Sequence, residues 1–165
     1  MFLLDKGLHW IAKGKLSIFL FHKVPALADA LQPGDMDQQT FRRTVAFIRK
    51  HFHVYPLAEA ARLLTVGRLP DRCAAITFDD GYQDWRQGAA SILQELNVPA
   101  TFFITTGQFD GRPMWHERLA HVVNECGEGE LDTRFCRLPP LPTATLADKV
   151  KAVKALEFHF KYIPP

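Results

Sequence analysis

Two adjacent carboxylates are the residues of this sequence that are best suited to chemistry. Asp79 and Asp80 follow the apolar run AAITF at 74–78 and are followed at once by Gly81. Like charges this close repel each other and raise one pKa, so a divalent cation is the usual reason for placing two carboxylates side by side. The pair therefore predicts metal-assisted chemistry. A solvated loop in an Asx turn is the simpler alternative for two aspartates before a glycine.

A short buried strand is expected to carry these carboxylates. The run at 74–78 is too short and too rich in strand-forming residues for a helix. Gly81 permits the sharp exit that a residue with a Cβ would resist. The carboxyl ends of strands are where α/β folds bind ligands and carry out reactions. Because successive strand side chains point to opposite faces, Asp79 and Asp80 serve one ligand only when the loop turns both toward it.

A helix over 87–96 and a second strand over 100–107 are expected after the acidic pair. Apolar residues recur at helical spacing over 87–96, Asp84 is a candidate N-cap, and Pro99 ends the helix. The segment 100–107 is again mainly apolar and ends in a glycine. A helix between two apolar strands is typical of a parallel sheet whose faces are covered by helices.

The remaining elements are predicted from the spacing of the other apolar residues. The expected elements are strands over 16–21 and 53–55, helices over 40–51, 57–66, 115–126 and 146–158, and a rigid extended connector over 138–142. Helices that alternate with short strands in this way predict an α/β chain.

Two motifs in this order resemble the polysaccharide deacetylases of the NodB-homology type. They are TFDDG at 77–81 and PATFF at 99–103, the second of which is followed by Gly107. The segment FHKV at 21–24 is similar to the Tyr-His-Arg-Val segment of the exopolysaccharide-processing branch. The resemblance covers residues 15–125. It implies an α/β fold, an incomplete distorted (β/α) barrel in which parallel strands alternate with helices.

The resemblance implies metal-dependent hydrolysis of an N-acetyl group on an amino sugar of a polysaccharide or glycan precursor. Asp80 would be the carboxylate ligand of the metal, and Asp79 would be the general base that takes a proton from water. His22, expected on the same rim, would be the general acid, with a buried structural histidine as the alternative. Zinc suits such a site, as do nickel, cobalt and iron. Trp115 is a candidate sugar platform or a helix-packing residue, and Thr106 is a candidate substrate contact or a cap.

The sequence departs from the family pattern after Gly107. Family members carry a His-Ser/Thr-x-x-His motif whose imidazoles complete the metal site, and no later histidine pair here has that spacing. We therefore expect residues 1–14 to be an N-terminal segment and residues 15–165 to be the N-terminal portion of a catalytic domain. Such a piece would be inactive alone, would expose a sheet edge and would associate with itself. The alternative is a truncated, inactive remnant that at most binds carbohydrate.

Composition and charge exclude some other functions. The chain is 47% apolar and 23% charged, and its net charge of +2 argues against nucleic acid as a partner. No apolar run has the character of a signal peptide or the length of a membrane span, so the expected location is the cytoplasm. The first eleven residues are a candidate amphipathic helix. Packing on the domain is favoured over contact with a membrane surface.

A receiver-like phosphotransfer domain is an alternative that also places paired acids at a strand end and binds magnesium. It needs the pair near the N-terminus and a phosphoacceptor aspartate on a later strand. Here the pair follows two predicted helices, over 40–51 and 57–66, and the strand over 100–107 carries no aspartate. The phosphotransfer alternative is therefore disfavoured.

Overall fold

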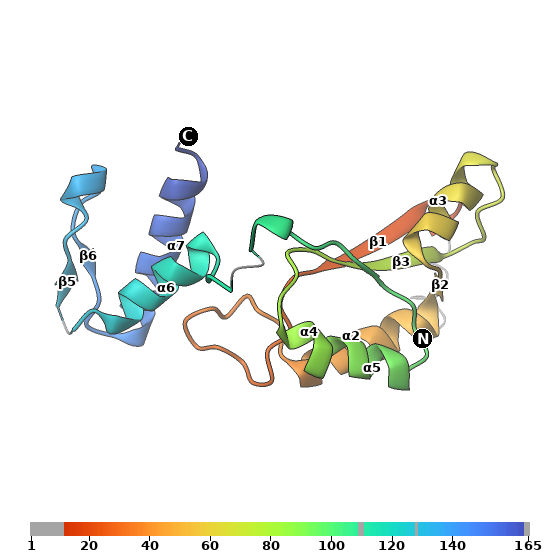
Figure 1. The fold of residues 1–165 in the computed structure, drawn as a ribbon, viewed down its shortest axis with the longest axis horizontal. Helices are drawn as coiled ribbons and strands as arrows, with labels where there is room; N and C mark the ends of the chain where they lie inside the picture. The colour runs from red at the N-terminus through yellow and green to blue at the C-terminus, as the bar shows by residue number, and fades with distance from the viewer. Residues whose placement is uncertain (1–11, 109–110, 128, 164–165) are drawn as a thin grey trace. The chain divides into compact units, whose positions relative to one another are not determined.

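The computed structural model describes residues 12–108, 111–127 and 129–163 and divides into two compact units. The first unit comprises the described residues of Met1–Leu27 and Asp35–Thr105, and the second those of Ala28–Gly34 and Thr106–Pro165. Figure 1 shows the elements of both units. The predicted amphipathic helix over the first eleven residues lies outside the described residues. Within the described ranges, none of the helices combines the length and the apolar composition that spanning a bilayer requires.

A parallel sheet forms the centre of the first unit. β3 (Cys73–Phe78) pairs along its whole length with β1 (Leu16–Phe21). β2 (His53–Val54) pairs with the beginning of β3, and β4 (Thr101–Phe102) pairs with its last two residues. All of these pairs are parallel and helices connect the strands (Figure 1), so the predicted α/β class is confirmed.

Helices and sheet share one apolar core in the first unit. The helices that contribute to it are α2 (Gln38–His51), α4 (Asp84–Gln87) and α5 (Ala89–Glu95), while α3 (Leu57–Thr65) also packs on β3. Helical spacing places the apolar residues of α2 on one face, which is the face that packs. The largest buried members of this core are Phe21, Val24, Phe41, Val45, Ile48, Ile76, Phe78, Trp85, Ile92, Leu93 and Val98.

The predicted helix over 87–96 is divided in two at Gly88, where α4 gives way to α5. Gly88 is buried so closely that a Cβ there would lie 2.5 Å from the Nε2 atom of Gln38. A side chain at this position would therefore require the end of the Gln38 side chain to move. Asp84 is the first residue of α4 rather than its N-cap, and no side chain caps this helix. The prediction of Asp84 as an N-cap is therefore wrong.

The predicted strand over 100–107 is shorter than expected. β4 ends at Phe102, and Phe103 makes the last ladder bond by donating its N–H to the Phe78 carbonyl oxygen (2.7 Å). β4 can pair no further because β3 itself ends at Phe78. The side chains that follow, up to Gly107, are exposed, so the expectation of a long buried strand here is wrong.

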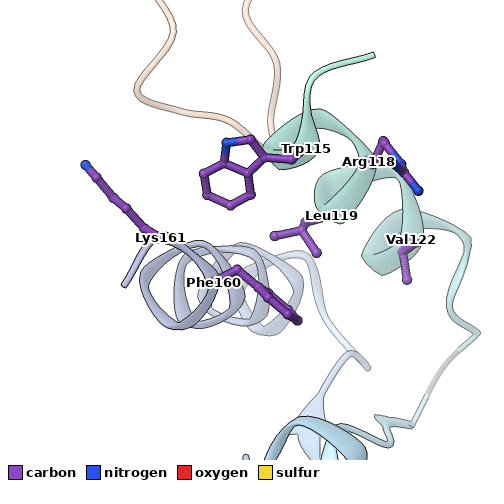
Figure 2. A pocket seen from close by; sticks show the side chains of 6 residues that line it. All are labelled: Trp115, Arg118, Leu119, Val122, Phe160 and Lys161. Atoms are coloured by element: carbon purple, nitrogen blue, oxygen red, sulfur yellow. The ribbon is translucent and has the colours of Figure 1, made fainter. Parts of the chain in front are cut away.

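The second unit packs α6 (Trp115–Glu125) against α7 (Leu146–Lys161). The side chains of Leu119 and Phe160 lie between the two helices (Figure 2) and pack on a small core that contains Val123. Both helices begin where the sequence predicts them, and α7 continues to Lys161, past the predicted end at 158. Two separate apolar clusters thus stabilise the two units.

A short hairpin connects α6 to α7. β5 (Glu130–Leu131) pairs antiparallel with β6 (Leu141–Pro142). The predicted extended connector over 138–142 is therefore a paired strand in its last two residues. In the intervening loop the buried Thr133 hydroxyl donates to the Pro139 carbonyl oxygen (2.6 Å). This bond satisfies a buried polar group and closes the loop.

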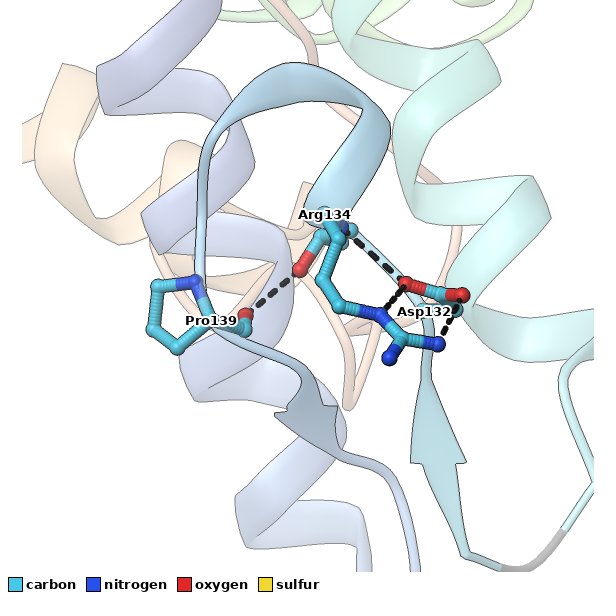
Figure 3. Close-up of polar contacts among 4 residues, drawn as sticks. Asp132, Arg134 and Pro139 are labelled. Atoms are coloured by element: carbon cyan, nitrogen blue, oxygen red, sulfur yellow. Dashed lines mark hydrogen bonds and ion pairs between the residues drawn. The ribbon is translucent and has the colours of Figure 1, made fainter.

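An exposed ion pair orders the same loop (Figure 3). The Arg134 guanidinium donates from Nε to Oδ1 of Asp132 (2.9 Å) and from Nη2 to Oδ2 (2.8 Å). These hydrogen bonds are the main reason why the pKa of Asp132 is lowered to about 2. The carboxylate is thus ionised at neutral pH. Because both side chains are exposed, we expect the pair to contribute little to the free energy of unfolding.

Candidate active site

The carboxyl ends of β1 and β3 bring His22 and Asp79 to the same edge of the sheet. Phe21 and Phe78 are partners in the parallel register, so the residues that follow them lie on neighbouring strand ends. The Asp79 N–H donates to the Phe21 carbonyl oxygen (3.1 Å), which extends the ladder one step beyond the strands. Adjacent strands lie about 4.8 Å apart. The imidazole and the carboxylate can therefore contact one bound molecule.

Asp80 lies at a sharp turn of the backbone directly after Asp79. Its φ is +84° and that of Gly81 is +85°, so two consecutive residues adopt left-handed conformations. A residue other than glycine is uncommon there, and such conformations cluster at functional sites. A Cβ at position 81 would also lie 3.0 Å from Cγ2 of Ile104, so glycine suits both the dihedral angle and the space. The predicted glycine turn is confirmed.

The three residues are accessible to a ligand. Asp79 and Asp80 are half-buried, and His22 is exposed. Two carboxylates beside an imidazole are suited to attracting a cation and to moving protons. In the part of the chain that the structure describes, however, no group of three His, Cys, Asp or Glu side chains is placed to hold a metal ion. Asp80 can supply one carboxylate ligand, and the described residues do not complete a metal centre around it.

The other two predicted site residues, Thr106 and Trp115, belong to the second unit. Thr106 begins the 3₁₀ turn Thr106–Gln108, and Trp115 is the first residue of α6. The Trp115 side chain is 46% exposed. It lines a pocket of about 710 Å³ together with the α6 and α7 side chains shown in Figure 2, namely Arg118, Leu119, Val122, Phe160 and Lys161. The indole therefore offers an accessible flat apolar face.

Two residues that sequence reasoning did not assign to the site hold the segment that contains His22. Oδ2 of Asp84 accepts a hydrogen bond from the Val24 N–H (2.7 Å), and the Trp85 indole Nε1–H donates to the His22 carbonyl oxygen (2.5 Å). Burial raises the pKa of the Asp84 carboxyl, and the hydrogen bond from Val24 opposes that rise. The only signal in the sequence was an acid and a tryptophan side by side, soon after the glycine turn.

Residues 67–128 match the family model described as polysaccharide deacetylase. The matched segment begins before β3 and extends past the end of α6, so it includes Asp79 and Asp80. No curated protein sequence matches the chain. The match confirms the resemblance that the two motifs of the sequence predict.

Solved structures also match parts of this chain. The Streptococcus pyogenes deacetylase PplD, in complex with acetate, has a TM-score of 0.50 and 17% identity, over 66% of this chain and 52% of that one. IcaB from Ammonifex degensii has a TM-score of 0.49 and 20% identity, over 88% and 70% of the two chains. A de-N-acetylase from Aggregatibacter actinomycetemcomitans has a TM-score of 0.45 and 15% identity, over 86% of this chain and 51% of that one. The likeness to PplD confirms the predicted fold class. This chain spans about half of PplD, so the likeness covers only part of the PplD fold.

Proposed function

We propose, on the premise that residues 67–128 belong to the polysaccharide deacetylase family, that this chain is part of a hydrolase that removes N-acetyl groups from amino sugars of a polysaccharide or glycan precursor. The observation that carries the proposal is the position of the acidic pair. Asp79 and Asp80 lie within the matched segment, at the end of β3, and His22 lies at the neighbouring end of β1. Carboxylates and an imidazole on one rim are the groups that amide hydrolysis needs for proton transfer.

The residues of this chain would supply the two proton transfers of the reaction. Water attacks the carbonyl carbon of the N-acetyl group while Asp79 accepts a proton from that water. The C–N bond then breaks, and His22 in its protonated form donates a proton to the leaving amine. The products are acetate and the free amino sugar. Each positioned acid or base of this kind contributes about 10²–10⁴-fold to the rate.

Asp80 is proposed as one ligand of a divalent metal ion. Zinc is the expected metal, and nickel, cobalt and iron are the alternatives. A bound cation would polarise the amide carbonyl and make water in the site more acidic. It would also relieve the repulsion between Asp79 and Asp80. Because the described residues form no cluster of three ligands, the other ligands would come from outside the described part of the chain.

Trp115 and Thr106 are proposed as contacts to the carbohydrate. Support comes from the accessible indole of Trp115 and from the pocket beside it, which Arg118 and Lys161 border with hydrogen-bond donors. An aromatic face suits the apolar face of a sugar ring, and such donors suit its hydroxyl groups. Thr106 offers an exposed hydroxyl for the same purpose.

Bound-metal analysis combined with acetate release tests the proposal. The protein is incubated with a short N-acetylglucosamine oligomer and added zinc, nickel or cobalt, both as the 165-residue chain and as any longer product of its gene. We expect acetate and stoichiometric metal from the longer product and neither from the 165 residues alone. Asp79→Asn serves as the control for contaminating hydrolases. Release of acetate by the 165-residue chain would contradict the prediction that its site is incomplete. Absence of acetate from any longer product would contradict the proposed deacetylase function.

Self-association of the 165-residue chain is a further expected property. Ile18 and Leu20 of β1 are 54% and 51% exposed, and in the described part of the sheet no strand pairs with the outer edge of β1. Exposed apolar side chains beside an unpaired strand edge favour association between copies. Sedimentation velocity should show species larger than the monomer, and Ile18→Lys with Leu20→Lys should shift them toward the monomer. A wild-type chain that sediments as a single monomer would contradict this expectation.

A further inference from the structure

Two hydrogen bonds attach residues 22–24, which follow β1, to the beginning of α4. They involve the consecutive α4 residues Asp84 and Trp85. The Val24 N–H donates to Oδ2 of Asp84 (2.7 Å), and the Trp85 indole donates to the His22 carbonyl oxygen (2.5 Å). The partners are 60 and 63 positions apart in the sequence. These bonds therefore fix a tertiary arrangement and are not part of a local turn. We call them the anchoring contacts.

One residue at each end of the anchoring contacts is buried in the core of the first unit. Val24 is fully buried, and Trp85 is 7% exposed. The Trp85 ring lies 5.5 Å from that of Phe78 and 5.1 Å from that of Phe102, measured between centroids. Packed aromatic side chains of this kind have little freedom to move. The anchoring contacts thus hold the backbone that follows the His22 Cα, and the β1–β3 ladder holds the backbone that precedes it, while the ring itself stays exposed.

The Asp84 carboxylate is kept in an environment that is unfavourable for a charge. Its second oxygen, Oδ1, is buried and has no hydrogen-bond partner among the described residues. Burying a carboxylate oxygen without a partner destabilises a protein. The positive charge of Lys23 compensates in part, since it favours the ionised form of Asp84. Residues that break a stability rule in this way are commonly found next to functional sites.

We propose that Asp84 and Trp85 are positioning residues that hold His22 on the rim beside Asp79. The proposal rests on the proposed deacetylase function, in which His22 protonates the leaving amine. Misplacement of a catalytic group by about 1 Å can lower a rate by about 10²-fold. The two anchoring contacts hold the backbone at His22 and Val24, and so they prevent such a displacement of the His22 side chain. Asp84 and Trp85 need not touch the substrate to have this effect.

Amide hydrogen exchange tests the anchoring itself, with mass-spectrometric detection of peptides that contain Val24. Asp84→Ala should raise exchange at Val24 about 10-fold, because its N–H loses its acceptor. Asp84→Asn keeps an acceptor oxygen and should restore most of the protection. Gln83→Ala, at an exposed neighbouring position, should change nothing.

Peptides from α2 report whether a variant has unfolded as a whole, since their exchange should stay at the wild-type level. Trp85→Phe keeps a ring in the core but removes the indole N–H, and it should loosen the same segment without Asp84 being changed. Unchanged exchange at Val24 in both Asp84→Ala and Trp85→Phe would overturn the proposal. So would failure of Asp84→Asn to restore protection in a folded protein.

Kinetics of whichever form of the protein releases acetate test the positioning role. Asp84→Ala should lower kcat about 10- to 100-fold with little change in KM, and Asp84→Asn should recover most of the loss. Loss of protection at Val24 with unchanged kcat would overturn positioning. A wild-type protein that releases no acetate would instead contradict the deacetylase function, and the exchange experiment would then decide the anchoring contacts alone.

Discussion

Asp79→Asn is expected to lower the rate of acetate release by about 10²–10⁴-fold while leaving the content of bound metal unchanged. An amide has nearly the shape of a carboxylate but cannot accept the proton of the attacking water. The backbone N–H of Asp79 donates to the Phe21 carbonyl oxygen, and the substitution leaves that bond intact. The loss should therefore fall on kcat rather than on the fold. The measurement is steady-state kinetics on the form of the protein that releases acetate, together with elemental analysis of metal per chain.

Asp80→Asn is the companion variant and should lower both metal content and turnover, because it removes the negative charge that attracts the cation. Asparagine tolerates the left-handed conformation at this position, so the turn should survive. Glu59→Gln, an exposed carboxylate-to-amide change on α3, is the matched control and should alter neither quantity. Equal metal loss in Asp79→Asn and Asp80→Asn would contradict this division of roles.

Phe78→Ala is expected to lower the free energy of unfolding of the first unit by about 3–5 kcal/mol. The Phe78 side chain is fully buried. Its ring centroid lies between 4.8 and 5.7 Å from those of four other aromatic residues, Phe21, Phe41, Trp85 and Phe102. Removing a ring from the middle of such a cluster leaves a cavity that its rigid neighbours cannot fill.

Phe135→Ala is the matched control for this prediction, because Phe135 is 82% exposed and should change the free energy of unfolding by less than about 0.5 kcal/mol. Urea unfolding at low protein concentration, followed by circular dichroism, gives both values. Similar small losses for the two variants would mean that Phe78 does not hold the core together. A large loss for Phe135→Ala would instead reveal a contact between copies of the chain.

Local sequence patterns were sufficient to predict the positions of several helices and strands. β1 lies at the predicted residues, and α2 begins two positions before the predicted start at 40. The order of the motifs then predicted that His22 and Asp79 share a rim, since each directly follows a strand of the same sheet. Short apolar runs and helical spacing carry this information without any knowledge of distant contacts.

The features that the sequence did not predict depend on contacts between residues far apart in the chain. The segment 87–96 has a helical pattern throughout, but it is divided at Gly88, which packs closely against the Gln38 side chain. An aspartate before a helix is ordinarily an N-cap. Here the carboxylate of Asp84 is bound instead by the Val24 N–H, 60 positions away. The length of β4 likewise depends on where its neighbour β3 ends and not on its own residues.

The backbone at Asp80 limits how this position can change over evolution. With a φ of +84°, it accepts glycine, asparagine and aspartate more readily than residues with longer or branched side chains. Of these three only aspartate carries a charge. Glutamate would also supply a carboxylate, but it would have to adopt the left-handed conformation at a cost of about 1–2 kcal/mol. Genetic drift can therefore remove the charge at position 80 in one step, but it cannot exchange one acidic residue for the other without straining the turn.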